Sequence, residues 1–299
     1  MNNWLFLALL APAVYTVVNF IDKYVIEHKV KDYRGMPIYA AIVGLVIGSI
    51  FWVIFGFPKL PIFDGFLVVI TGILTLFGYA LYFNALSKNQ TSYIIGLFQL
   101  IPLITLILSV IFLHENISSI QLLGFALILV SAIALSVKKE KKKLKLNSAF
   151  YLIVVADIFF ALSNIILKFA ISANSITKIF SHESWGIAAG GLILWIVFPK
   201  VRIAFLKTTS SVGNRVLGIM FLNEIIFICS KVLTFLAISL GPVALVSVLG
   251  STQIFYGLAY GFILTLIAPS IFKEDIKGEN LVKKIIFMAL LFIGIWFTK

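Results

Sequence analysis

The sequence has little of what soluble enzymes and secreted domains depend on. It contains one cysteine, three histidines and only 12% charged residues among its 299. A single cysteine excludes a disulfide within the chain and gives no metal site. So few charges exclude an ordinary soluble domain, in which about a quarter of the residues are charged. The chain has no HExxH helix, GxSxG elbow or Walker-type phosphate loop, so we expect neither an enzyme nor a bound cofactor or metal.

What the sequence does have is 61% hydrophobic residues, gathered in long runs. A helix needs about 20 mostly apolar residues to cross a bilayer, since it rises about 1.5 Å per residue through about 30 Å of hydrocarbon. Open strands would leave backbone groups unpaired in lipid, so the runs predict an all-α polytopic membrane protein with ten transmembrane helices. The runs are Trp4–Val25, Pro37–Gly56, Ile62–Leu86, Thr91–Leu113, Ser118–Val137, Ser148–Ile171, Ser184–Phe198, Val216–Leu240, Pro242–Ile267 and Leu281–Thr298.

The basic residues behind the net charge of +12 lie between the apolar runs, which argues against nucleic acid as a partner. Nineteen Lys and Arg follow the odd-numbered runs, whereas only Lys59, Lys178 and Lys299 lie on the opposite side. Cytoplasmic loops carry the excess of Lys and Arg, so this bias predicts that both termini are outside. Residues 138–147 are expected to form a basic cytoplasmic linker between two halves, residues 1–137 and 148–299.

The two halves share sequence patterns. Asn-x-x-x-Lys occurs at residues 19–23 in the first run and at residues 164–168 in the sixth. Gly-x-x-x-Gly occurs at residues 44–48 in the second run and at residues 186–190 in the seventh, and small residues one turn apart let helices approach closely in lipid. Because each half has an odd number of runs, the second half enters the membrane from the opposite side. The sequence therefore predicts two inverted-topology five-helix repeats, which are typical of secondary transporters that work by alternating access.

Several short motifs carry a family resemblance. They are Leu100-Ile101-Pro102-Leu103, Phe112-Leu113-His114-Glu115 and Gln121-Leu122-Leu123-Gly124 in the first half, and Gly241-Pro242-Val243-Ala244 and Phe272-Lys273-Glu274 in the second. With these motifs the chain resembles the EamA-type group of the drug/metabolite transporter superfamily over nearly its whole length. The resemblance implies ten helices in two repeats, and export or exchange of small metabolites, amino acids among them. Three features depart from it. Ile254 aligns with Pro102, and the stretch before Glu274 is longer than its counterpart before Glu115. The family is also usually drawn with cytoplasmic termini, whereas the Lys and Arg bias here predicts the reverse.

Four ionisable side chains lie deep in the apolar runs, namely Asp157, Lys168, Glu224 and Lys231. Such a group costs about 3 kcal/mol at the bilayer centre on insertion scales, so it is expected to face a cavity or a partner. Lys231 is predicted to attract a substrate carboxylate or phosphate, and Glu224 and Asp157 are predicted to couple transport to a proton or another cation. The alternative is a structural ion-pair network that joins these groups to one another or to Asp22.

Neutral side chains at matching depths complete the predicted substrate site. Asn19 and Asn164 recur in the two halves, and Gln99 and Gln253 lie mid-helix in the fourth and ninth runs. Hydrogen bonds between helices explain the two asparagines equally well, and a tyrosine taken alone is more often a packing residue. The predicted substrate-binding residues are Asn19, Tyr82, Gln99, Asn164, Lys168, Lys231, Gln253 and Tyr256.

The sequence as a whole predicts a secondary transporter of the cell membrane, an exporter or exchanger of small polar metabolites such as amino acids or other carboxylates. Its expected partners are the small-molecule substrate, the lipid bilayer and a coupling proton, and it is expected to be a monomer or a homodimer. The alternatives are a non-transporting receptor or assembly protein and, after these, an intramembrane enzyme. An inverted repeat argues against a receptor, which has no need of two exchangeable half-bundles.

Overall fold

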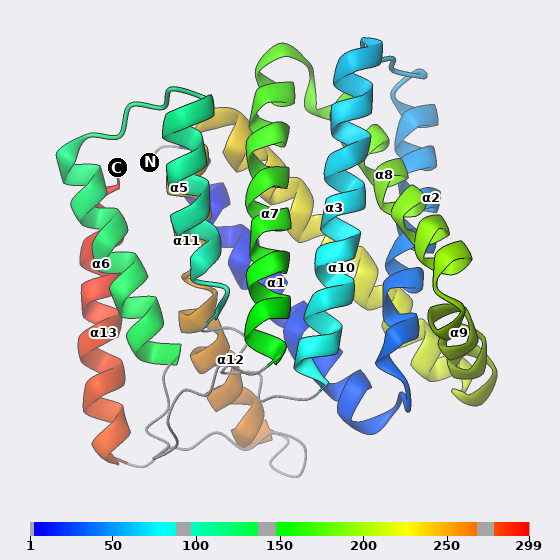
Figure 1. The fold of residues 1–299 in the computed structure, drawn as a ribbon. Coiled ribbons are helices and arrows are strands. Elements are labelled where there is room, and N and C mark those ends of the chain that lie inside the picture. Colours follow the sequence, from blue (N-terminus) through cyan, green and yellow to red (C-terminus); the bar gives the residue numbers. More distant parts are fainter. Residues whose placement is uncertain (1–2, 88–96, 137–147, 268–277, 299) are drawn as a thin grey trace.

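The computed structural model describes residues 3–87, 97–136, 148–267 and 278–298, and every regular element in these ranges is a helix (Figure 1). The helices are α1 (Asn3–His28), η1 (Tyr33–Gly35, a 3₁₀ helix), α2 (Met36–Ile54), α3 (Ile62–Leu86), α5 (Leu100–Phe112), α6 (Ser119–Ser136), α7 (Ser148–Ala173), α8 (Ile176–Val197), α9 (Pro199–Ser211), α10 (Asn214–Leu240), α11 (Val243–Gly250), α12 (Gln253–Ile267) and α13 (Gly278–Phe297). A helix suits lipid because it pairs its own backbone groups.

Length and hydropathy identify the helices that can cross a membrane. In the described parts of the chain, six helical stretches are long and apolar enough, or seven if the bent pair α8–α9 counts as one span. Leu100–Phe112, Ser119–Ala134 and Ile286–Phe297 are shorter apolar helices. Each of the ten predicted runs overlaps one of the helices, although the start of the fourth run lies outside the described residues. The protein is thus a polytopic helical membrane protein, and ten complete spans stay a prediction.

Three boundaries differ from the sequence prediction. The seventh run was predicted from Ser184, but α8 begins at Ile176, because six polar residues between 177 and 184 dilute the hydrophobic signal without interrupting the helix. The basic segment after it was predicted as a loop, but it forms α9, which is bent by 104° from α8. The ninth run was predicted as one helix, but it is divided between α11 and α12.

Helices from the two halves pack against each other. The main pairs are α1 with α10, α3 with α7, α2 with α8, α3 with α8, and α6 with α13. The crossing of α3 and α8 is especially close: a Cβ atom added to Gly186 would lie 2.2 Å from the carbonyl oxygen of Val69, and one added to Gly72 would lie 2.2 Å from that of Glu183. Only glycine allows this approach, which brings Glu183 into the centre of the bundle.

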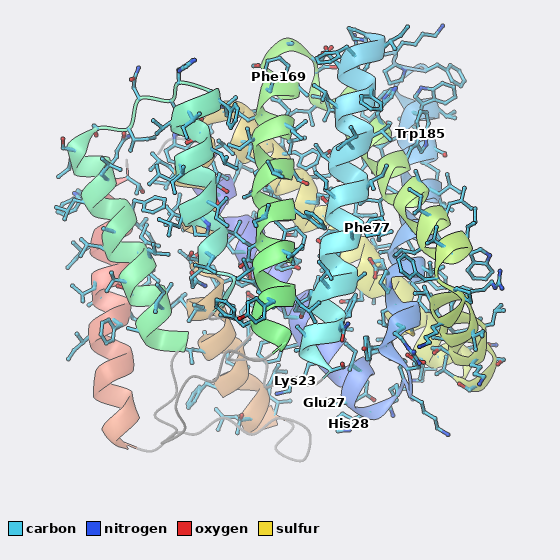
Figure 2. All side chains as sticks on the ribbon, in the orientation of Figure 1. Lys23, Glu27, His28, Phe77, Phe169 and Trp185 are labelled. Atoms are coloured by element: carbon cyan, nitrogen blue, oxygen red, sulfur yellow. The ribbon has the colours of Figure 1, made fainter. Side chains whose placement is uncertain are left out.

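Basic residues gather at one end of the bundle. Lys23, Glu27 and His28 lie at the lower end of α1 in Figure 2. The same end holds η1 and α9, which pack together. Within η1 the Arg34 guanidinium donates hydrogen bonds of 2.8 and 2.5 Å to Asp32, the residue before this helix, and these bonds lower the pKa of that carboxyl. The start of α1 and the end of α13 both lie toward the opposite end (Figure 1).

Candidate functional site

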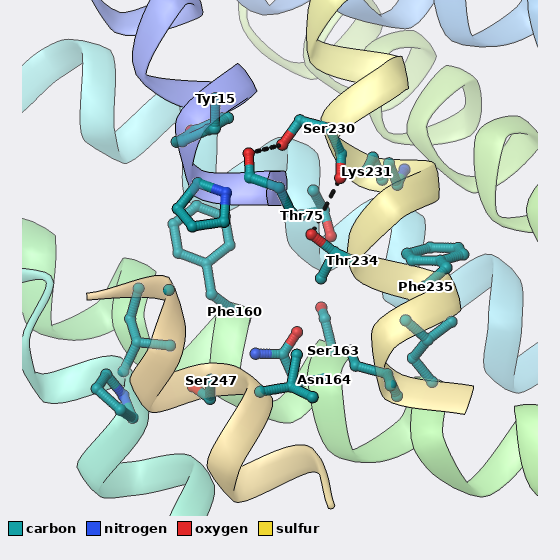
Figure 3. A pocket seen from close by; sticks show the side chains of 18 of the residues that line it. Tyr15, Thr75, Phe160, Ser163, Asn164, Ser230, Lys231, Thr234, Phe235 and Ser247 are labelled. Atoms are coloured by element: carbon teal, nitrogen blue, oxygen red, sulfur yellow. Dashed lines mark hydrogen bonds between the residues drawn. The ribbon is translucent and has the colours of Figure 1, made fainter. Parts of the chain in front are cut away.

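A cavity of about 270 Å³ lies between the two halves of the chain. Its wall is built by α1, α3 and the start of α5 from the first half, and by α7, α8, α10, α11 and the start of α12 from the second. Its polar lining comprises Tyr15, Thr71, Thr75, Tyr79, Gln99, Ser163, Asn164, Glu183, Ser230, Lys231, Thr234, Ser247, Ser251 and Gln253. Figure 3 shows several of these side chains around one open space. The volume suits a small metabolite, since pockets for drug-sized ligands start at about 300 Å³.

Helix ends meet the cavity in both halves. Helix α5 begins after Gln99, and α11 ends at Gly250, two residues before Gln253 opens α12. Both glutamines line the cavity. Irregular backbone at membrane depth is tolerated only where it is buried in protein or lines a cavity. The break between α11 and α12 therefore lies where its unpaired backbone groups can find partners, and broken helices of this kind form the substrate sites of many transporters.

The strongest electrostatic feature of the cavity is a buried ion pair. The Lys231 ammonium on α10 donates a hydrogen bond to Oε2 of Glu183 on α8. Only 8% of the Lys231 side chain and 2% of the Glu183 side chain are exposed. The ammonium also lies 5.5 Å from the centre of the Phe235 ring. Because the two charges are opposite, the pair adds no net charge to the cavity, but it makes the wall that carries it strongly polar.

Hydroxyl groups tie the wall helices together. Ser230 Oγ on α10 donates to the carbonyl of Ala11 on α1 at 2.9 Å, whereas Thr234 Oγ1 donates within α10, to the carbonyl of Ser230 at 3.1 Å (Figure 3). Ser163 Oγ on α7 donates to the carbonyl of Thr71 on α3 at 3.2 Å. A hydroxyl that donates its proton keeps two lone pairs, so these groups hold the helices and still offer acceptors to a ligand.

The structure brings four of the eight predicted substrate-binding residues to the cavity, namely Gln99, Asn164, Lys231 and Gln253. Sequence reasoning missed Glu183, because the seventh span was started one residue too late to include it. The signal that could have found it is Asn174-Ser175, a typical helix start. A start there places Glu183 two turns into α8, as the structure has it.

The other four residues lie elsewhere. The Lys168 ammonium donates hydrogen bonds of 2.7 Å to the carbonyls of Ile238 and Gly241, so it caps the end of α10 rather than lining the cavity. Tyr82 is buried in a cluster with Phe98. Asn19 and Tyr256 are half-buried and, within the described ranges, outside the lining. The sequence gives the depth of a residue along its helix but not the side of the helix that faces the cavity. A prediction based on depth therefore included these four residues.

The two predicted ion-coupling residues also lie outside the lining of the cavity. Asp157 is fully buried, and in the part of the chain that the structure describes neither of its oxygens has a hydrogen-bond partner. Glu224 is half-buried on α10 beside Asn223, whose amide donates to Asp22 at 2.8 Å. The ion pair of Lys231 is thus made with Glu183 and not with Asp157 or Asp22, the partners considered from the sequence. Within the described ranges no group of three His, Cys, Asp or Glu could hold a metal ion.

The fold and the cavity define a class of protein, a polytopic helical membrane protein with a small polar cavity lined by residues from both halves of the chain. Residues 2–137 match the model of the EamA-like transporter family. An uncharacterized protein of Methanocaldococcus jannaschii is 30% identical over 140 residues, which cover 46% of this chain and 98% of that protein. A crystal structure with 15% identity matches with a TM-score of 0.71 over 99% of this chain and 97% of the other, so the two share a fold.

The chain belongs to the EamA-like transporter family. It is therefore a membrane transporter of the drug/metabolite type, as its motifs indicated.

Proposed function

We propose that this protein is a secondary transporter that exports or exchanges small polar metabolites bearing a carboxylate, amino acids among them, by alternating access. The observation that carries the proposal is the buried Lys231–Glu183 pair facing a small cavity between the halves. A charged pair at membrane depth is costly, and such groups mark substrate pathways more often than they stabilise a fold. An ammonium in this position attracts a substrate carboxylate.

The pairing of the helices supports two inverted repeats. If the halves are exchanged, α1 takes the place of α7 and α3 that of α10, so the α1–α10 pair becomes the α7–α3 pair. The pairs α2–α8 and α6–α13 are each converted into themselves. The M. jannaschii relative, with about half the length of this chain, supports the view that a half is a unit. Two such units can rock against each other around the cavity.

Two charged side chains bind the backbone around the α10–α11 turn, next to the cavity. Lys168 donates to the last carbonyls of α10, and Glu115 accepts hydrogen bonds of 2.7 and 3.3 Å from the backbone of Val243 and Ala244 at the start of α11. A cation at the end of a helix and an anion at the start of the next both suit the helix dipoles. We propose that these bonds break when the transporter opens toward this side.

Counterflow in proteoliposomes tests the transport proposal. Lys231→Ala should abolish counterflow of an amino acid or other carboxylate that the wild-type protein exchanges, because the substrate anion loses its cation. Lys59→Ala, at an exposed site in the α2–α3 connection, is the matched control and should exchange normally. Wild-type rates in the Lys231→Ala protein, at equal amounts of folded protein, would contradict the proposal.

Ion coupling by Glu224 and Asp157 is a separate part of the proposal. A carboxyl that carries the coupling proton can be replaced by its amide without loss of exchange, but the amide cannot carry the proton. Glu224→Gln or Asp157→Asn should therefore keep counterflow and lose accumulation driven by a pH gradient. If a pH gradient still drives accumulation of the substrate in both variants, neither Glu224 nor Asp157 is the coupling group.

A further inference from the structure

Helix α9 runs in a different direction from the helix that precedes it. Its thirteen residues, Pro199–Ser211, are bent by 104° from α8, whose 22 residues are long enough to cross a bilayer. A chain that crosses the bilayer and then turns by about a right angle continues along the membrane surface. Figure 1 shows α9 at the end of the bundle where η1 lies, and the two elements pack together. The bend therefore puts α9 at the boundary between lipid and water.

One face of α9 is fixed to the bundle. Ala204 and Thr208 are buried on this face. The Phe205 ring lies 4.8 Å from the ring of Tyr39 on α2, measured between ring centres, and the Tyr39 hydroxyl shares a 2.7 Å hydrogen bond with the hydroxyl of Thr209. These contacts hold the helix against the bundle, so the residues on its outer face keep a fixed direction.

The outer face of α9 carries two large apolar side chains. Ile203 and Leu206 are 48% and 53% exposed. With 3.6 residues per turn, they lie on one side of the helix, roughly opposite the buried Ala204 and Thr208. An apolar side that points away from the protein is typical of a helix that lies in the membrane interface and inserts this side among the acyl chains.

Basic side chains flank this apolar side. Lys200 and Lys207 are seven residues apart and share one flank, and Arg202 lies on the other; all three are exposed. Helix α9 contains no Asp or Glu, and within the described ranges none of its three cations forms a salt bridge. The carboxylate whose charge reaches Lys207 is that of Asp32, which is already bonded to Arg34. The three cations are therefore available to an outside anion.

We propose that α9 is an interfacial helix that binds anionic phospholipids. Ile203 and Leu206 enter the outer layer of acyl chains, and Lys200, Arg202 and Lys207 bind the phosphates of the headgroups. The long stems of Lys and Arg can cover apolar surface while their charged ends reach the headgroups. This inference concerns the outer surface of the protein, so it does not depend on the transported substrate or on alternating access.

A basic helix that only faces water is the alternative. Such a helix has polar residues on its outer face, whereas α9 has Ile203 and Leu206 between its cations. Basic loops that only set the membrane orientation need neither a helix nor an apolar side. Each Lys or Arg near an anionic membrane surface strengthens binding about fivefold, so three such residues together contribute about 100-fold. Charge and apolar surface therefore favour the same partner, an anionic bilayer.

Quenching of a fluorescent probe on α9 tests the inference. The full-length Ile203→Cys protein, in a Cys229→Ser background because Cys229 is exposed, is labelled with bimane and placed in phosphatidylcholine nanodiscs. The nanodiscs contain a small, equal fraction of either phosphatidylglycerol or phosphatidylcholine that carries a nitroxide on its acyl chain. Both lipids should quench the probe, and labelled phosphatidylglycerol should quench it at least about threefold more strongly. The difference should shrink at high salt, which screens exposed charges.

Removal of the cations should remove the lipid preference. In the same labelled protein, Lys200→Gln, Arg202→Gln and Lys207→Gln together should make quenching by the two lipids nearly equal while the probe stays in the membrane. Lys59→Gln, at an exposed site in the α2–α3 connection, is the matched control and should keep the full preference. A triple variant that folds and still prefers phosphatidylglycerol would show that these three side chains do not bind the headgroups.

The protein without these three substitutions also gives a decisive result. If neither labelled lipid quenches the probe at residue 203, the outer face of α9 meets water or another protein and the inference is wrong. If the two lipids quench it equally, α9 lies in the membrane but does not select anionic headgroups, and the proposed lipid site is wrong. Should the triple variant not fold, the ratio of the two quenching values and its response to salt decide the question.

Discussion

At the scale of single residues, Asp157 is a carboxylic acid with no exposed surface and no hydrogen-bond partner within the described ranges. Burying a polar group without a partner costs free energy, so Asp157→Val should raise the free energy of unfolding by about 1–3 kcal/mol. Asp64→Val is the matched control. Asp64 accepts a 2.7 Å hydrogen bond from Asn174, so its loss should lower stability instead. Thermal unfolding in detergent measures both changes, and a lower melting temperature for Asp157→Val would mean that this carboxyl has a stabilising partner.

Replacement of Lys168 is expected to lower the stability of the protein, whereas replacement of Asp157 is expected to raise it. The Lys168 ammonium donates to two backbone carbonyls at the end of α10. Lys168→Met keeps most of the length of the side chain but removes both bonds, and it should cost about 1–3 kcal/mol of stability. Lys59→Met, at an exposed position, should cost nothing measurable. Equal melting temperatures for the two variants would show that the bonds to α10 contribute little.

What the sequence could tell about the site differs from residue to residue. Lys231 stands out because it is a charge in the middle of an apolar run, and the cost of that position demands an explanation. Glu183 does not stand out, because polar residues surround it and a hydrophobicity count starts the span only at the next residue. Whether Lys168 faces the cavity or the end of α10 depends on how α7 is turned about its axis, and depth along the helix does not contain that information.

At the scale of helices, the α3–α8 crossing depends on glycine. An alanine Cβ at Gly186 would lie 2.2 Å from the Val69 carbonyl oxygen, so Gly186→Ala should push α3 and α8 apart and cost about 1–3 kcal/mol. Gly218→Ala in α10 is the control, since nothing lies within 4 Å of the added atom. Because alanine is the better helix former, that variant should keep or slightly raise stability. If the Gly186→Ala and Gly218→Ala variants unfold at equal temperatures, the crossing of α3 and α8 is not as tight as proposed.

The helices themselves were largely predictable, because long apolar runs leave few alternatives in lipid. The exceptions have physical causes. Helix α9 is short of apolar residues, so tertiary contacts and not hydropathy define it. It packs against η1, and its Thr209 hydroxyl shares a 2.7 Å hydrogen bond with the hydroxyl of Tyr39 on α2. The break between α11 and α12 falls at Gly250-Ser251-Thr252, a turn signal that is hidden when apolar residues surround it.

At the scale of the whole molecule, the proposal that the two halves are inserted in opposite directions gives the sharpest prediction. Lys31 and Lys178 each follow the first helix of their half, and Lys59 and Lys207 each follow the second. In an inverted repeat the members of each pair lie on opposite sides of the membrane, whereas in a parallel repeat they lie on the same side. The excess of Lys and Arg predicts that Lys31 and Lys207 lie in the cytoplasm.

Single cysteines at these four positions, in a Cys229→Ser background, distinguish the two arrangements. On intact cells an impermeant maleimide should label residues 59 and 178, and it should label residues 31 and 207 only after the membrane is opened. Labelling of 31 and 178 from the same side would rule out inversion, and with it a rocking mechanism around a shared cavity. Labelling of 31 and 207 from outside would keep the inversion but reverse the orientation, so that the caps made by Lys168 and Glu115 would close the cavity toward the cytoplasm instead.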